Sequence, residues 1–265
     1  MPNFLIAKLQ QFTSLSDADR VALHEVTDRR RQVAAREDIV REGEPHGPIR
    51  AILDGWACRY RRLEDGRRQV SALLLPGDLC DTHVTVLRAI DHSIGALTPV
   101  TVAEIPRDRL DRLVGYHPRL GRALWREMLA AASIQREWTV NMARREGVER
   151  LGHLFCALFH RLRAAELTRD RGYGLPLSQS DLADASGLTD VHVKRCLQAL
   201  RDRDLITSRS RWLTILDLPA LQRASGFSPD YCHVGRRDSV RAADPILSLP
   251  PETGRHEASH RHPAR

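Results

Sequence analysis

In LSQSDLADASGLTDVHVKRCLQALRDRDL, residues 177–205, the chain carries the signals of two short helices. Ser178 can act as an N-cap with Asp181 three residues later, and Gly187 then ends the first helix. Thr189 can cap the second helix, whose apolar side chains recur at the spacing of one buried face. The stretch therefore predicts two helices joined at a tight corner.

The second predicted helix leaves one polar face free. Val193, Leu197 and Leu200 fall on its buried side. The other side carries groups that can reach base edges and phosphates in a major groove, namely Val191, His192, Arg195 and Gln198, with Lys194 at the flank. Because any helical hairpin in a globular domain has a polar face, this pattern alone favours DNA binding and a solvated surface about equally.

A predicted β-hairpin follows the second helix directly. Residues 205–216 contain two short apolar strands separated by a turn segment, which is typical of a wing. The tip of this hairpin carries Arg209 and Arg211, and we expect both to meet a neighbouring phosphate.

These motifs carry a family resemblance. Residues 177–200 resemble the helix-turn-helix of the Crp/Fnr family of bacterial transcription regulators, and the order of elements is similar over residues 20–216. The resemblance implies an α+β fold with an N-terminal antiparallel β jelly roll and flanking helices, a long dimerisation helix and a C-terminal winged helix-turn-helix domain. It implies four partners: double-stranded DNA, a second copy of the chain in a homodimer, RNA polymerase and an unidentified small-molecule effector.

The same resemblance implies a division of the chain into four parts. Residues 1–117 would form a cyclic-nucleotide-binding-like sensor domain, and residues 118–142 the dimerisation helix. Residues 143–227 would form the winged helix-turn-helix domain. Residues 228–265 are rich in proline, histidine and arginine and poor in large apolar side chains, which predicts a disordered tail. We expect this tail to be solvated rather than to bind metal through His256, His260 and His262.

Composition sets broad limits on the protein. With 265 residues, 42% of them hydrophobic, the chain is long enough for two cores and has the composition of a soluble globular protein. No apolar run is long enough to cross a membrane and the start lacks the pattern of a signal peptide, so we expect a cytoplasmic protein. The five cysteines, at positions 58, 80, 156, 196 and 232, lack metal-ligand spacing, so no metal or cofactor is predicted.

The charge of the chain suits a polyanionic partner without demonstrating one. The formal net charge is +7 and the isoelectric point is about 9.6. Residues 176–216, however, contain six cations and five acids, so the helix-turn-helix and wing are nearly neutral.

Residues 38–105 predict the antiparallel barrel or jelly roll. Short apolar runs alternate there with turn residues such as Asp54-Gly55 and Asp65-Gly66. We expect residues 49–53 and 56–63 to pair around Asp54-Gly55, and residues 69–75 to return after Asp65-Gly66.

The ligand signature of the family is missing from this region. Nucleotide-binding members carry Gly-Glu-Leu and, later, an arginine that binds the cyclic phosphate; residues 77–83 and 90–93 hold neither that glutamate nor that arginine. Because an aspartate near the phosphate position would repel the phosphate, we predict no tight binding of cyclic AMP. An iron-sulfur cluster is not expected, since the first cysteine is Cys58. A haem-based gas sensor is an alternative, because Cys80 and His83 lie near the axial-ligand positions of carbon-monoxide-sensing members.

The long helix predicted from Pro118 carries an apolar stripe of Leu120, Leu124, Met128, Ala131, Ile134, Trp138 and Met142. In the family this helix forms the dimer, and the alternative is a helix packed on its own barrel. Where the family's second chain reaches the nucleotide base, this helix carries Gln135 and Arg136. A hinge at residues 141–146 precedes a core helix at 147–167, and Asp217 and Gly226 bound a last helix.

Roles in DNA contact follow from the resemblance, position by position. Ser178, Gln179, Ser180 and Thr189 stand where the family touches phosphates, and Arg195 stands where it reads a guanine. Asp190 and Val191 replace the Arg-Glu pair of the best-known members, so the half-site should differ from the usual one. His192 is expected to donate to a phosphate or to guanine.

Two other classes of function compete with this one. An enzyme of the cupin kind needs clustered metal ligands, but His46, His83 and His92 lie far apart within residues 38–105, so no catalytic residue is predicted. A protein-interaction module built on the winged helix stays open, because the helix-turn-helix is nearly neutral.

Overall fold

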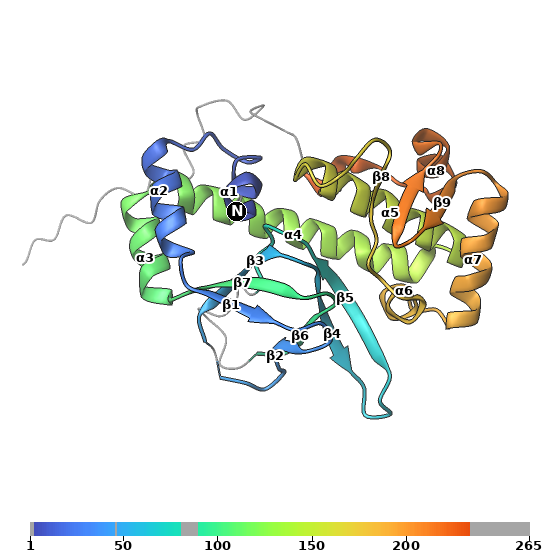
Figure 1. Ribbon diagram of the computed structural model, residues 1–265, viewed down its shortest axis with the longest axis horizontal. Helices are drawn as coiled ribbons and strands as arrows, with labels where there is room; N and C mark the ends of the chain where they lie inside the picture. Colours follow the sequence, from blue (N-terminus) through green and yellow to red (C-terminus); the bar gives the residue numbers. More distant parts are fainter. Residues whose placement is uncertain (1–2, 46, 81–89, 234–265) are drawn as a thin grey trace, which may run out of the picture.

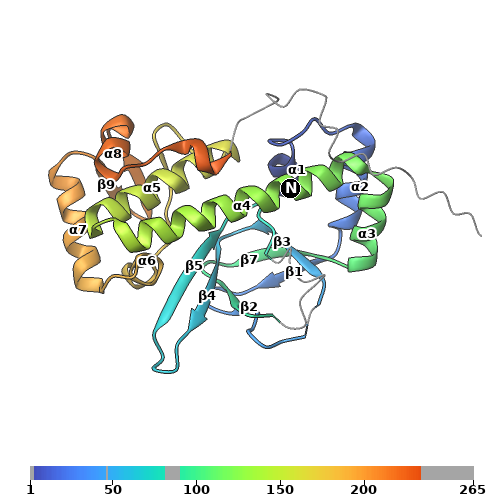
Figure 2. The same ribbon diagram turned by 180° about the vertical axis from the view of Figure 1, so that it is seen from behind.

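The computed structural model describes residues 3–45, 47–80 and 90–233. Figure 1 shows an N-terminal β-rich domain and a C-terminal mainly helical domain. Helix α4 (Pro118–Arg144) runs along both, as the view from behind in Figure 2 makes plain. None of the helices described is both long and apolar enough to cross a bilayer.

Two antiparallel sheets form the N-terminal roll, which confirms the predicted jelly roll. One sheet has the order β1 (Arg30–Val33), β7 (Val100–Ile105), β3 (Ile49–Asp54). The other has the order β2 (Asp38–Val40), β6 (Ser93–Ala96), β4 (Ala57–Arg62), β5 (Arg68–Leu74). Apolar side chains from both sheets, among them Ile52, Ala57 and Val102, are buried in one cluster between them.

One of the two expected hairpins is confirmed and the other is wrong. Strands β4 and β5 pair across the Asp65-Gly66 turn, where Gly66 has a φ of 86°. Strand β3 pairs with β7 and not with β4. Gly55 carries the chain from one sheet to the other with a φ of +83°, and a Cβ there would lie 2.2 Å from the carbonyl oxygen of Pro99. The turn residues were read correctly, but the sheet partner of β3 is settled by packing.

Three helices flank the roll: α1 (Phe4–Leu9), α2 (Asp17–Val26) and α3 (Arg107–Tyr116). Leu5 and Leu23 from these helices pack with Ile49 of β3 and with Leu120 at the start of α4. The flanking helices therefore hold the N-terminal half of α4 on the roll.

Helix α4 turns the predicted stripe mainly toward its own chain. Leu120 is fully buried, Leu124 packs on the same cluster, and Trp138 packs on the core of the C-terminal domain. A different apolar row is exposed, with Trp125 57%, Leu129 56% and Val140 46% accessible. Much of the stripe thus packs on its own chain, as the alternative expected, while the part of α4 that meets a second copy stays a prediction.

Helix α5 (Gly147–Ala164) forms the centre of the C-terminal domain. A three-stranded sheet, β8 (Gly172–Gly174), β10 (Trp212–Ile215) and β9 (Ile206–Arg209), packs beside helices α6 (Gln179–Ser186), α7 (Asp190–Asp202) and α8 (Leu218–Ser225). Tyr173 is fully buried and its hydroxyl donates to the Phe155 carbonyl at 3.1 Å. Asp217 caps α8 and Gly226 ends it, as predicted.

The helical break and the chain end differ from expectation. Helix α4 ends at Arg144 rather than at 142, and α5 begins at Gly147, so the break falls within the predicted hinge. The tail was predicted to be disordered from 228, but the 3-10 helix η2 (Pro229–Cys232) is ordered: Tyr231 stacks on the buried His153 with ring centroids 5.6 Å apart. Residues 234–265, and with them the three tail histidines, lie outside the described residues.

Candidate nucleic-acid interface

The corner between α6 and α7 forms as the sequence predicts. The Ser178 hydroxyl accepts from the Asp181 N–H at 3.1 Å, and Asp181 Oδ2 accepts from the Ser178 N–H at 2.9 Å, which completes a capping box. Gly187 ends α6 in the left-handed conformation with a φ of 62°. Gln179 and Ser180 are exposed in the first turn, where backbone N–H groups point outward.

Helix α7 buries one side and exposes the other. The Thr189 hydroxyl accepts from the His192 N–H at 3.3 Å and begins the helix, while Val193 and Leu200 are buried. The side chains that remain exposed include Asp190, Val191, Lys194, Arg195 and Gln198. This face agrees with the one expected for groove contact, and Val191, an apolar side chain, is 67% accessible.

Two residues of the predicted face are engaged within the domain. A Cβ placed on Gly147 would lie 2.9 Å from His192 Nε2, so the half-buried imidazole sits against the first residue of α5. His192 therefore packs the corner between α5 and α7. The Gln198 amide donates to Asp202 Oδ1 at 2.7 Å, one turn along the helix.

The predicted wing is present and is tied to α7. Strands β9 and β10 pair with Arg209 opposite Trp212, and Ser210 and Arg211 form the turn with φ values of 50° and 61°. Both tip arginines are exposed. Arg201 donates to Ser208 Oγ at 2.7 Å and so joins the last turn of α7 to β9. The sequence analysis missed this role, because a cation at a helix end has many local explanations.

The near-neutral charge of the helix-turn-helix changes once the N-terminal domain is included. Asp181 lies 2.6 Å from the Arg36 guanidinium and 3.1 Å from that of Arg68. Asp184 lies 2.7 Å from Arg68. Two of the five acids between residues 176 and 216 are thus neutralised by arginines distant in sequence, and the exposed surface is more positive than the local count suggests.

Known protein families match both domains. Residues 30–117 match the cyclic nucleotide-binding domain family, and residues 149–224 match the Crp-like helix-turn-helix domain family. The chain belongs to the Crp/Fnr family of transcription regulators.

Individual Crp/Fnr relatives agree with this assignment. The anaerobic regulatory protein of Pasteurella multocida is 26% identical over 213 residues, which cover 80% of this chain and 78% of the relative. The transcriptional activator protein FnrL of Cereibacter sphaeroides is 25% identical over 218 residues, which cover 81% and 87%. The structure of FixK2 from Bradyrhizobium japonicum has the same fold, with a TM-score of 0.66, 24% identity and coverage of 75% of this chain and 98% of that one.

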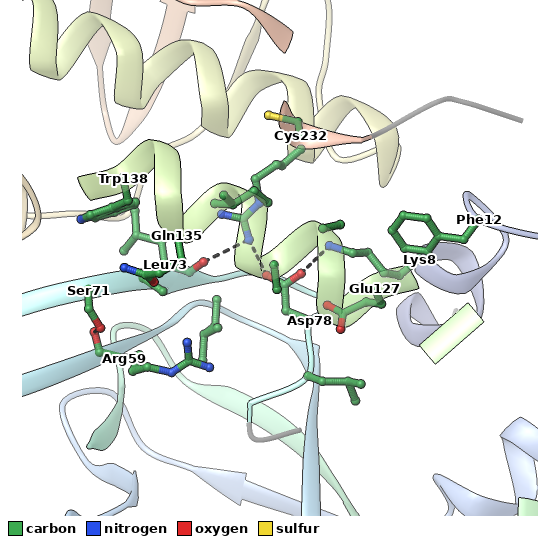
Figure 3. A pocket seen from close by; sticks show the side chains of 17 residues that line it. Lys8, Phe12, Arg59, Ser71, Leu73, Asp78, Glu127, Gln135, Trp138 and Cys232 are labelled. Carbon is green, nitrogen blue, oxygen red and sulfur yellow. Dashed lines mark hydrogen bonds and ion pairs between the residues drawn. The ribbon is translucent and has the colours of Figure 1, made fainter. Parts of the chain in front are cut away.

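A small cavity lies between the roll and α4 of this Crp/Fnr protein (Figure 3). Its volume is about 60 Å³, which is room for a few water molecules. Asp78 lies at its wall, 2.7 Å from Lys8 Nζ and 2.5 Å from the Arg161 guanidinium. The side chains that line it include three buried N–H groups without an acceptor among the described residues: Arg59 Nε, Trp138 Nε1 and Arg161 Nε.

Asp78 is buried and its charge is paired. Burial would raise its pKa, but the charges of Lys8 and Arg161 hold the pKa below its ordinary value. Its carboxylate also accepts from the Leu75 N–H at 2.8 Å. Asp78 thus joins α1, the roll and α5 through paired charges. The weak binding of cyclic AMP stays a prediction, because residues 81–83 lie outside the described residues.

The haem alternative finds no assembled ligand pair in the described residues. Cys80 is buried in the core of the roll, and His83 lies outside the described part. The His117 ring pairs with Asp19, Nδ1 to carboxylate, at 2.8 Å. No group of three His, Cys, Asp or Glu side chains within residues 3–45, 47–80 and 90–233 converges as metal ligands would.

Proposed function

We propose that this Crp/Fnr regulator binds double-stranded DNA sequence-specifically, as a homodimer on an inverted repeat, in the cytoplasm and without catalytic activity of its own. The observation that carries the proposal is the exposed face of α7, on which Val191, Lys194 and Arg195 stay accessible while the opposite side of the helix is packed. A helix held by its buried side presents such a face to a major groove.

Charge supports DNA over a protein partner. With Asp181 and Asp184 paired to Arg36 and Arg68, the remaining surface of the helix-turn-helix and wing carries more cations than acids. Phosphate contacts dominate affinity for nucleic acid, so a positive surface favours DNA. The exposed N-terminal turn of α6 adds backbone N–H groups that suit a phosphate.

The exposed row of α4 supports a second copy as the partner. Trp125, Leu129, Ala132 and Val140 follow one another at intervals of four, three and eight residues along an exposed side of the helix. Apolar residues at this spacing pack well against the same face of another helix. We infer that two α4 helices meet along this row, which replaces the stripe predicted from the sequence.

Selection of bound sites from a random duplex library tests the proposal. We expect enrichment of an inverted repeat whose half-sites lie about 34 Å apart, one duplex turn. Light scattering should report a dimer, and gel shifts should weaken steeply as salt rises. A monomer that enriches no duplex at low ionic strength would overturn the proposal, and salt-independent capture of a protein instead would favour the interaction module.

A further inference from the structure

Five side chains join the N-terminal domain to α6, and we call them the α6 interface. Arg36 donates to both carboxylate oxygens of Asp181, at 2.6 and 2.8 Å. Arg68 donates to Asp181 at 3.1 Å and to Asp184 at 2.7 Å. Gln69 donates to the main-chain carbonyl of Asp184 at 2.8 Å. One short helix of the C-terminal domain is thus bonded to two separate segments of the roll.

The α6 interface is half-buried and geometrically specific. The Asp181 side chain is only 2% accessible, and the Arg68 guanidinium also lies 5.4 Å from the centre of the Tyr60 ring. Burial would raise the pKa of Asp181, but hydrogen bonds from Arg36 and Ser178 lower it well below its ordinary value. A two-pronged arginine–carboxylate pair fixes orientation as well as distance.

Asp181 performs two tasks at once. It is the acid of the capping box that begins α6 and the acceptor for two arginines of the N-terminal domain. Figure 1 shows α6 lying beside β5, with α7 directed away from the roll. The N-terminal domain therefore holds the end of α6 that is proposed to meet phosphates.

We propose that Arg36 and Arg68 are positioning residues for DNA reading, acting through Asp181 and Asp184 to fix the helix-turn-helix on the N-terminal domain. This inference rests on the proposed function. With the interface closed, the exposed face of α7 stays accessible and two acids near the phosphate-binding turn are neutralised. Opening it would free the C-terminal domain to rotate and would expose those acids to the duplex, so closure supports binding.

Asp184→Asn separates this proposal from simple electrostatics. Removing a negative charge from a DNA-binding domain should tighten binding if charge alone matters. The α6 interface predicts the opposite, a loss of about fivefold in affinity for the selected duplex, because the partner of Arg68 is weakened. The Asn variant keeps the shape of the side chain and the main-chain carbonyl that Gln69 uses. Asp181 is left intact because it caps α6.

Arg68→Ala completes the test. Its loss of affinity should be smaller in the Asp184→Asn background than in the wild type, since the two residues act together. The slope of log affinity against log salt concentration should stay the same in Arg68→Ala, whereas loss of a direct phosphate contact would flatten this slope by about one. Arg67→Ala is the matched control. Arg67 lies on the same hairpin as Arg68 and pairs with the exposed Asp65 at 2.7 Å, so the affinity of this variant for the selected duplex should not change.

Different results overturn the positioning role and the proposed DNA binding. Tighter binding by Asp184→Asn, or additive losses in the double variant, would overturn the positioning role while leaving DNA binding intact. If the wild type binds no duplex, the proposed function fails and the role in DNA reading fails with it; hydrogen exchange then tests only whether the α6 interface holds the helix. Faster exchange at the α6 amides of Asp184→Asn in the full-length protein would support the interface, and unchanged exchange would refute it.

Discussion

The exposed face of α7 and the cavity under α4 both contain cationic side chains. Those on α7 face solvent, whereas those at the cavity are paired with a buried carboxylate. On α7, Lys194 and Arg195 project into solvent. Around the cavity, Asp78 is buried and pairs with both Lys8 and Arg161, whose side chains are only 14% and 9% accessible. An exposed cation is free to meet a ligand at little cost, whereas a buried one must keep a partner or lose several kcal/mol. Burial, which is a property of the fold, separates the two roles.

Neutralising Asp78 should produce the largest effect. Asp78→Asn leaves Lys8 and Arg161 facing each other without their anion, and we expect a loss of about 3 to 5 kcal/mol in the free energy of unfolding. Urea denaturation measures it. Asp65→Asn, which breaks the exposed pair with Arg67, should leave stability unchanged. Equal effects of the two changes would show that burial does not separate the charges as described.

Glu127 lines the same cavity, and its raised pKa makes the cost of burying a charge there measurable as a dependence of stability on pH. It is buried, and desolvation raises its pKa to about 7 despite the nearby cations Lys8, Arg161 and Arg59, while Asp78 adds to the rise. A carboxyl group whose folded pKa exceeds its unfolded value of 4.5 stabilises the fold below pH 4.5, and this stability is lost as pH rises through 7.

Glu127→Gln should remove that pH dependence. We expect the variant to be more stable than the wild type by about 2 to 3 kcal/mol at pH 8, with the difference vanishing below pH 4.5. Urea denaturation from pH 4 to 8 of both proteins gives the difference curve. A curve that is flat across this range would mean that Glu127 does not titrate inside the cavity.

On the exposed side of the comparison, Arg195→Ala should cost about 1 to 3 kcal/mol on the selected duplex and relax the preference at one base position. Lys194→Ala, its neighbour, should weaken selected and random duplexes alike and flatten the salt slope by about one. Binding titrations at several salt concentrations measure both. If Arg195→Ala weakens both duplexes equally, Arg195 contacts a phosphate rather than a base.

Two matching capping boxes provide the smallest test. In α2 and in α6 the serine hydroxyl donates to the aspartate at 2.7 Å, from Ser16 to Asp19 and from Ser178 to Asp181. Ser16→Ala and Ser178→Ala should each cost about 1 kcal/mol of stability. Only Ser178→Ala should also weaken DNA binding. Calorimetry and gel shifts separate the two effects, and equal binding by both variants would deny Ser178 a contact with DNA.

Local patterns predicted the helix-turn-helix well because its signals are short-range. Caps at Ser178 and Thr189, the left-handed Gly187 and the spacing of Val193 and Leu200 all act within one or two turns. The wing was predicted for the same reason, because its strands and turn are also short-range features. Local patterns failed for strand β3, whose partner β7 lies some fifty residues away. For α4, where two faces both carry apolar residues, they did not decide which face stays exposed.

The candidate interface shows the same limit. The exposure of Lys194 and Arg195 follows from the periodicity of α7, but the position of His192 against Gly147 depends on how α5 approaches α7. Nothing near Arg36 or Arg68 in the sequence points to Asp181, because the partners are more than a hundred residues apart. A count of charges within residues 176–216 was therefore misleading.

By itself the sequence determined the elements of this protein and their order: a roll of short strands, one long helix, a capped helical corner and a wing. It did so because propensity, capping and side-chain periodicity are properties of neighbouring residues. The tertiary structure alone decided which charges are buried around Asp78, which side of α4 stays exposed and which arginines hold α6. Those outcomes depend on which distant segments share a low-dielectric interior, where an unpaired charge is costly and a paired one becomes part of the architecture.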